Sequence, residues 1–403
     1  MSESPVLSRR IKEIEVLRGL AFAAVVFQHT MAHYGADPAI RLGDGVLLAL
    51  LVLLSKFAVP VFIFITGVLM FYNYQDEMKY GKFYAKRAKD IGVPFLLWSI
   101  FYITLNHAWE GNNLQGILSN LEMIITGKSS YHLWYVFMII QFYLLFPLFR
   151  KLVLSVFKRL SARWRTVAVI GSGIAYTALL PFIFTIMPGF ERANIPGITA
   201  LFTIYADRNA LYYLFYFVLG AAAGLHIEHW RNVVKQTQFL YGTVFTVYLG
   251  WFLYHIVEGF QTGDGIVIQF EGLALLRPAM AIFLTSSILV YYRLAMYLST
   301  VEDRFWVRCI SGMGMLSYGA YLMHAGVLRL SFAMEGWWLV EWSVTIRTLV
   351  AFLLCVLMCC LFTWLLALLL FGKWVVGSHL SVKSKHNRNE IPNSKNSRAP
   401  RVL

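Results

Sequence analysis

Long apolar stretches alternate with short polar and charged segments along nearly the whole chain. Each apolar stretch has roughly the 17–25 residues that an α-helix needs to cross the hydrocarbon layer of a bilayer. The pattern therefore predicts an all-α, polytopic membrane protein with about ten transmembrane helices. The predicted spans are residues 16–36, 46–72, 91–109, 132–151, 166–187, 210–227, 239–257, 273–293, 311–331 and 346–373.

Polar segments at the two ends divide the chain into three predicted regions. Residues 1–15 are expected to form a cytoplasmic tail rather than a cleaved signal peptide, because no small-residue cleavage site follows the next apolar run. Residues 16–373 form the transmembrane domain, with no soluble domain appended. Residues 374–403 are basic and rich in Ser and Asn, which predicts a disordered cytoplasmic tail attracted to anionic lipid.

The distribution of charge gives the orientation of these spans. The chain is 59% hydrophobic and has a net charge of +14. Most of its 35 lysines and arginines fall in alternate loops, beginning with the N-terminal tail. Because Lys and Arg mark the cytoplasmic side of a membrane, both termini are predicted to be cytoplasmic. We expect a multi-pass protein of a cell membrane, namely a bacterial plasma membrane.

Two ionisable side chains interrupt the first span. His29 follows Arg18 by eleven positions, which is about 16 Å and three turns of a helix, so both lie on nearly the same face at different depths. An ionisable group at membrane depth costs roughly 2.5–3.5 kcal/mol on insertion scales and is a candidate functional residue. The pair favours an anion held by Arg18 and proton chemistry at His29. A snorkelling arginine and a hydrogen-bonded structural histidine would give the same pattern.

Further candidates lie in three other segments. A basic cluster before the third span is either a topology signal or a site for a phosphorylated cytosolic donor; it consists of Lys86, Arg87 and Lys89. His132 and Trp134 begin the fourth span at the outer face, where aromatic residues often form an interfacial belt. Tyr321 and His324 lie well inside the ninth span.

Several catalytic classes have no signature in the sequence. There is no Walker A loop, no Gly-x-Ser-x-Gly elbow and no His-Glu-x-x-His helix. The four cysteines do not stand at metal-ligand spacing with histidines, so no metal site is predicted.

Four short motifs carry a resemblance that extends from about residue 9 to 373. They are residues 14–21 with His29 eleven positions after Arg18, residues 59–67, residues 132–135 and residues 317–324. In this order they resemble the landmarks of the family 3 membrane acyltransferases, multi-span enzymes that modify hydroxyls of surface glycans and lipids. Two departures stand out: Thr66 replaces the usual serine, and Asp90 replaces the second arginine of an Arg-x-x-Arg motif that begins at Arg87.

The resemblance implies an O-acyltransferase that moves a short acyl group, acetyl above all, from cytosolic acyl-CoA to a surface glycan or lipid-linked sugar. Acyl-CoA would be a co-substrate, with no tightly bound cofactor, no metal and no nucleic-acid partner. The alternative from another class is an exporter of polysaccharide or lipid-linked intermediates. An exporter needs no acyl-CoA and would tolerate the loss of His29 if that histidine is structural.

The same resemblance assigns roles to the candidate residues. Arg18 and His29 are the expected catalytic residues. His29 either deprotonates the acceptor hydroxyl or carries the acyl group covalently, and the sequence does not separate these routes. Donor phosphates are expected at Arg18, Lys86, Arg87 and Lys89. Contacts to the acceptor, or a proton relay, are expected at His132, Trp134, Tyr321 and His324.

Overall fold

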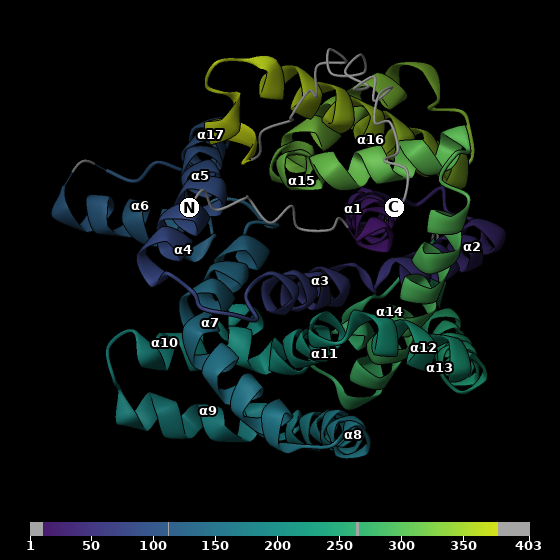
Figure 1. Cartoon of the computed structure of the whole chain (residues 1–403). Helices are drawn as coiled ribbons and strands as arrows, with labels where there is room; N and C mark the ends of the chain where they lie inside the picture. Colours follow the sequence, from purple (N-terminus) through teal and green to yellow (C-terminus); the bar gives the residue numbers. More distant parts are fainter. Residues whose placement is uncertain (1–10, 112, 263–265, 378–403) are drawn as a thin grey trace, which may run out of the picture.

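The computed structural model describes residues 11–111, 113–262 and 266–377, and these residues are mostly helical (Figure 1). The longer helices are α1 (Lys12–Tyr34), α2 (Leu42–Ser55), α3 (Ala58–Asn73), α5 (Val93–Leu105), α6 (Leu114–Thr126), α7 (Trp134–Arg159), α8 (Ala162–Leu179), α9 (Phe182–Ala193), α11 (Leu214–Leu225), α12 (Ile227–Gln236), α13 (Gln238–Glu258), α14 (Pro278–Thr300), α15 (Phe305–Trp338) and α16 (Val344–Leu368). The shorter elements are α4 (Tyr80–Arg87), α10 (Ile198–Phe202), α17 (Gly372–Val376), the π-helix η1 (Ala88–Gly92), the 3-10 turns η2 (Ala206–Arg208), η3 (Ala210–Tyr213) and η4 (Glu271–Leu273), and a two-stranded antiparallel hairpin of β1 (Gln261–Thr262) and β2 (Ile266–Val267).

The prediction of an all-α polytopic membrane protein is confirmed. Within the described residues, 7 helices are long and apolar enough to span a membrane, or up to 9 if each of two bent pairs forms one span. The pairs bend by 65° between α8 and α9 and by 111° where Ala210–Leu225 meets α12. The predicted span 311–331 lies within α15, which is not among these helices. Glycines, tyrosines and His324 lower the mean hydropathy of this segment. The exact count and the cytoplasmic placement of both termini stay predictions, and most of both tails lies outside the described residues.

Helix α1 lies at the centre of the bundle, between α15 and α16 on one side and α3 and α14 on the other (Figure 1). Leu17, Phe22 and Val26 on this helix are fully buried. A helix that is apolar around most of its circumference is buried on all sides. Arg18 and His29, which lie on this helix, are therefore surrounded by other helices of the protein.

Two glycines allow α1 and α15 to approach closely. A Cβ atom on Gly19 would lie 2.1 Å from the carbonyl oxygen of Ile310, and one on Gly314 would lie 1.9 Å from the carbonyl oxygen of Glu15. Small residues let helix backbones pack together inside a membrane, where apolar burial alone drives little association. This contact sets α1 against the helix that carries Tyr321 and His324.

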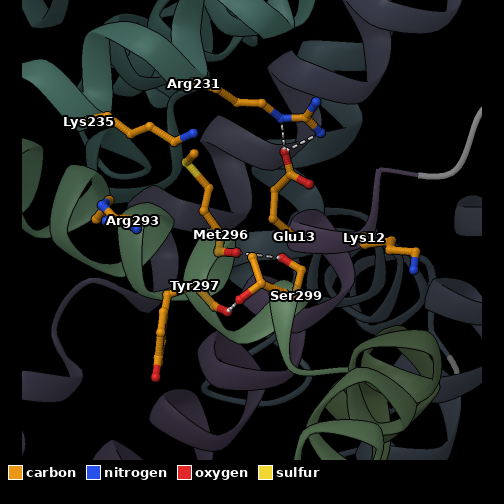
Figure 2. Close-up of a pocket in the computed structure, with 9 residues that line it drawn as sticks. Lys12, Glu13, Arg231, Lys235, Arg293, Met296, Tyr297 and Ser299 are labelled. Carbon is orange, nitrogen blue, oxygen red and sulfur yellow. Dashed lines mark hydrogen bonds and ion pairs between the residues drawn. The ribbon is translucent and has the colours of Figure 1, made fainter. Parts of the chain in front are cut away.

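The first turn of α1 is held by a buried ion pair. Glu13 is 4% exposed, and both Nε and Nη2 of Arg231 lie 2.7 Å from its Oε1 atom. The hydroxyl of Tyr292 donates to the same oxygen at 3.0 Å. Figure 2 shows this pair beside a cavity of about 540 Å³ between α1, α12 and α14. Glu13 and Arg18 are about 140° apart around the helix, so this cavity and Arg18 are on different sides of α1.

A second ionic cluster holds the last turn of α1. The Tyr34 hydroxyl donates to Oε2 of Glu335 at 2.6 Å. Arg347 on α16 donates through Nε to Oε1 of Glu335 at 2.5 Å and through Nη1 to Asp37 at 3.2 Å. Glu335 is 3% exposed, so its charge is compensated by partners rather than by water. The central helix is thus fixed to its neighbours at both ends.

Candidate functional site

Three histidines from distant parts of the sequence meet inside the bundle. His29 is on α1, His132 precedes α7 and His324 is on α15. The ring centroid of His324 lies 5.2 Å from that of His29 and 4.5 Å from that of His132. His132 and His324 are fully buried, whereas His29 is partly exposed. The structure therefore joins three separately predicted residues into one cluster, which we call the histidine cluster.

Hydrogen bonds fix the ring of His132. Its Nε2 atom lies 3.2 Å from the carbonyl oxygen of Leu322, and its Nδ1 atom lies 3.1 Å from the hydroxyl of Ser130. A carbonyl oxygen only accepts, so this network assigns the proton to Nε2 and makes Nδ1 the acceptor from Ser130. Both ring nitrogens of His132 are thus engaged by the protein, which suits a positioning role.

His324 has the complementary arrangement, with one nitrogen engaged. Its Nδ1 atom lies 2.5 Å from the carbonyl oxygen of Tyr321, which assigns the proton to Nδ1. Its Nε2 atom is buried and has no hydrogen-bond partner within the described part of the chain. A buried polar atom without a partner is unusual and marks a candidate functional site. In this tautomer Nε2 carries a lone pair that can accept a proton.

Tyr321 belongs to the cluster, whereas Trp134 lies beside other aromatic residues. The Tyr321 hydroxyl donates to the carbonyl oxygen of His132, and its ring centroid is 5.3 Å from that of His324. The ring neighbours of Trp134 are Tyr135 at 6.4 Å and Tyr213 at 6.3 Å. The structure thus brings Tyr321 to the histidines and places Trp134 with two tyrosines. The acceptor-binding role of each stays a prediction.

Arg18 contacts both α15 and the tyrosines of α7. Its Nε atom donates to the hydroxyl of Ser317 at 3.2 Å. The phenols of Tyr143 and Tyr135 are near enough to interact electrostatically with its guanidinium group. Arg18 is therefore held at one side of α1 by polar groups, at a level about 16 Å along the helix from His29.

Arg87 reaches the same tyrosine. Its guanidinium carbon lies 5.4 Å from the ring centroid of Tyr143, and its Nη2 atom donates to the Tyr74 hydroxyl at 3.5 Å. Its Nε atom is buried and has no partner among the described residues. Arg18 and Arg87 thus share Tyr143 as a neighbour, and together they form what we call the arginine pair.

The two lysines of the basic cluster have other surroundings. Lys86 is exposed on α4. Lys89 is exposed on the π-helix η1, with its Nζ atom 5.0 Å from the ring centroid of Trp374. Single π-turns are frequent at functional sites. The structure therefore separates Arg87, which points into the bundle, from Lys86 and Lys89 at the surface.

A comparison with protein families decides what kind of protein carries this geometry. A family model described as an acyltransferase domain matches residues 11–371. The chain is a family 3 acyltransferase. None of the curated proteins and none of the solved structures matches it. The resemblance inferred from the four motifs is confirmed, and the protein is a multi-pass membrane acyltransferase.

Several polar residues of this acyltransferase escaped the sequence analysis. Tyr131 lies with its ring centroid 4.7 Å from that of His29, and Ser317 contacts Arg18. Tyr135 interacts electrostatically with Arg18, and its ring centroid lies 5.6 Å from that of Tyr321; Tyr143 is a neighbour of both Arg18 and Arg87. Ser317 and Tyr135 lie within two of the four motifs, so the sequence carried a signal for both. Tyr131 and Tyr143 carry no local signal, because only the fold brings them to the site.

The acyltransferase brings its histidines together without an evident metal site. In the part of the chain that the structure describes, no group of three or more His, Cys, Asp or Glu side chains is placed to hold a metal ion. His132 uses both ring nitrogens, and His324 uses Nδ1, for contacts within the protein. Of the described ring nitrogens of His132 and His324, only Nε2 of His324 has no hydrogen-bond partner within the protein.

Proposed function

We propose that this acyltransferase moves a short acyl group, with acetyl as the first candidate, from cytosolic acyl-CoA to a hydroxyl of a surface glycan or lipid-linked sugar in a bacterial plasma membrane. The supporting observation is that Arg18 of the arginine pair and His29 of the histidine cluster lie at two levels along α1, about 16 Å apart. An acyl-CoA molecule also has two separate functional parts, because its pantetheine arm lies between the anionic phosphates and the reactive thioester.

The arginine pair suits the phosphate end of the donor. Guanidinium groups bind phosphate oxygens through charge-assisted, often bidentate hydrogen bonds. Arg18 uses Nε for Ser317, and Arg87 uses Nη2 for a long hydrogen bond to Tyr74. The positive-inside prediction places this level on the cytoplasmic side, where acyl-CoA is available. Lys86 and Lys89 would attract the anionic donor to this part of the surface.

The histidine cluster suits the reacting end. In direct transfer, the acceptor hydroxyl loses its proton to a histidine while its oxygen attacks the thioester carbonyl carbon. The carbon–sulfur bond then breaks, and the CoA thiolate takes up a proton as it leaves. We assign the base to His29, which is partly exposed and faces Tyr131, and the relay of the proton to Nε2 of His324.

A covalent route uses the same residues in two steps. His29 attacks the thioester, so that a carbon–nitrogen bond forms as the carbon–sulfur bond breaks. The CoA thiolate leaves with the proton that the imidazolium of His29 gives up. The acceptor hydroxyl then attacks the acylimidazole, a carbon–oxygen bond forms as the carbon–nitrogen bond breaks, and the released imidazole takes up the hydroxyl proton. A transient acyl-histidine would appear in this route as an added acyl mass on the peptide that contains His29 after rapid denaturation at neutral pH, and it would be absent in direct transfer.

The test of the proposal is acyl transfer in inverted membrane vesicles that contain the protein. Radiolabelled acetyl-CoA is added to vesicles with wild type or with His29→Ala, and label is counted in glycan and lipid fractions. We expect label that depends on His29, and the labelled fraction identifies the acceptor class. Succinyl-CoA is the second donor. Equal labelling by wild type and His29→Ala with both donors would contradict the proposal.

A further inference from the structure

An apolar groove opens beside the histidine cluster. It has a volume of about 580 Å³ and lies between α5, α15 and α16. Its lining is aromatic and aliphatic apart from one charged residue, and includes Trp98, Phe101, Gly326, Phe362, Leu365 and the charged Arg329. A groove of this composition between membrane helices fits a hydrocarbon chain. The single cation distinguishes it from a plain lipid-facing surface.

One wall of the groove is also a wall of the histidine cluster. Gly326 lies two positions after His324, and its backbone N–H donates to the Tyr102 hydroxyl at 3.2 Å. The Tyr102 hydroxyl donates in turn to the carbonyl oxygen of Leu322 at 2.9 Å. The same carbonyl accepts from Nε2 of His132. A molecule in the groove would thus be separated from the histidines by little more than this tyrosine and one turn of α15.

Arg329 connects the groove to the loop that carries His132. Its Nη2 atom donates to Oδ1 of Asn106 at 2.5 Å, and the Asn106 amide donates to the carbonyl oxygen of Ser129 at 3.3 Å. The next three residues include Tyr131, which faces His29, and His132. Arg329 itself is exposed, and a guanidinium has five N–H donors, so further donors are available for a ligand.

We propose that the groove holds the hydrocarbon chain of the acyl acceptor and that Arg329 binds its phosphate, so that the acceptor is a phosphate-linked lipid sugar rather than a free polysaccharide. This inference rests on the proposed function, because it names the acceptor of that same site. Arg329 lies five positions after His324, about 7.5 Å further along α15. The same five positions turn the side chain about 140° around α15, so Arg329 is linked to the histidine cluster through Asn106 and the loop that carries Tyr131 and not through the face of α15 that carries His324.

Binding is tested first, because it does not require turnover. The full-length protein in nanodiscs is titrated with a polyprenyl phosphate and with the matching polyprenol, and bound lipid is measured by native mass spectrometry. We expect the wild type to bind the phosphate about tenfold more tightly than the alcohol, a typical gain for one charge-assisted contact. Arg329→Gln should bring the two affinities close together. Equal affinities in the wild type would overturn the proposal.

A second pair of variants tests the groove itself. A Cβ atom on Gly326 would lie 3.7 Å from the Tyr102 hydroxyl, which is ordinary contact, so Gly326→Leu adds bulk to the groove at a position that tolerates a Cβ. It should weaken binding of both lipids. The matched control is Leu357→Phe on α16, a residue that is 66% exposed and does not line the groove. Identical binding by the two variants would contradict the assigned groove.

The last arm separates an acceptor site from a general lipid site. Dioleoyl phosphatidylglycerol is titrated against the same variants. If it binds as tightly as the polyprenyl phosphate and with the same dependence on Arg329, the site recognises ordinary phospholipid and the acceptor assignment is wrong. If selective binding of polyprenyl phosphate is found while no acyl transfer occurs with any donor, the proposed function fails and the lipid site stands.

Discussion

The imidazole rings of His29 and His324 are stacked with their centroids 5.2 Å apart, although the two residues come from opposite ends of the chain. Helix α1 and helix α15 each contribute one ring, and the close approach at Gly19 and Gly314 sets the two helices together. We therefore expect the two rings to act together, so that they do not contribute independently to catalysis.

We expect His29→Ala and His324→Ala each to lower kcat by about 10²–10⁴-fold, the usual contribution of a positioned acid or base. The double variant should be scarcely worse than His29→Ala alone, because residues that act together show non-additive losses. The measurement is kcat at saturating acetyl-CoA, with protein amount in the membrane as control. Losses that multiply would show that the two rings work separately.

The arginine pair should act on donor affinity. Arg87→Ala should raise KM for acyl-CoA by about tenfold or more, since one lost charge-assisted contact corresponds to roughly 1.4 kcal/mol. Lys86→Ala is the matched control, because this neighbouring cation is exposed and lies away from Tyr143. Its KM should change much less. An equal rise in both variants would mean that the cluster attracts the donor only by its overall charge.

The ion pair at the start of α1 should matter for stability. Glu13→Ala leaves Arg231 without its buried partner, and breaking a buried pair typically costs about 3–5 kcal/mol. Glu228 contacts the same guanidinium at 2.6 Å, but its side chain is 78% exposed, so Glu228→Ala should cost only about 0–1 kcal/mol. Thermal unfolding in detergent compares the two. A similar loss in both variants would contradict the distinction by burial.

A loop that leads to His132 should be sensitive to acid. A hydrogen bond from Tyr205, followed by contacts with Lys128, lowers the pKa of Glu122 below its usual 4.5. Hydrogen bonds with Tyr205 and then with Glu122 raise the pKa of Lys128 above its usual 10.5. The contribution of Glu122 is therefore present above pH 4.5 and is lost as the pH falls through its lowered pKa, whereas that of Lys128 is lost only at high pH.

This pH dependence is measured by hydrogen exchange over residues 114–130, corrected for intrinsic rates. In the wild type, protection of this segment should decrease as the pH falls below 4.5. Glu122→Gln lacks the titrating carboxylate, so its protection should be weaker at neutral pH and change less with acid. Identical profiles for the two proteins would exclude Glu122 as the responsible group.

The local patterns of the sequence predicted the fold class, and they placed Arg18 and His29 on one helix, as the structure has them. Runs of apolar residues predicted the spanning helices, and the 3.6-residue period placed Arg18 and His29 on one side of α1. Rules of this kind work when both residues lie on the same helix, because the geometry of that helix then fixes their relative positions. The glycines, tyrosines and His324 that lower the hydropathy of residues 311–331 are visible in the sequence, but that Gly314 lies at the contact with α1 is not.

Contacts in the site between residues of different helices could not be predicted from helical periodicity. His132 and His324 were separate candidates, and nothing in their spacing indicates that their rings lie 4.5 Å apart. Likewise, Lys86 and Arg87 look equivalent in the sequence, yet only Arg87 reaches Tyr143, which lies on another helix. The neighbours of a side chain in a bundle depend on how helices are arranged, and local periodicity carries no information about that arrangement.

The anchoring of α1 at both ends limits how this protein can work. A transporter-like cycle, in which helices rock to open the centre to one side and then the other, would have to break the contacts of Glu13 or of Glu335 in every turnover. Such buried pairs are costly to break. Under the proposed function, the central helix would stay in place during turnover, while the flexible arm of the donor reaches inward along it to an acceptor that approaches from the opposite side.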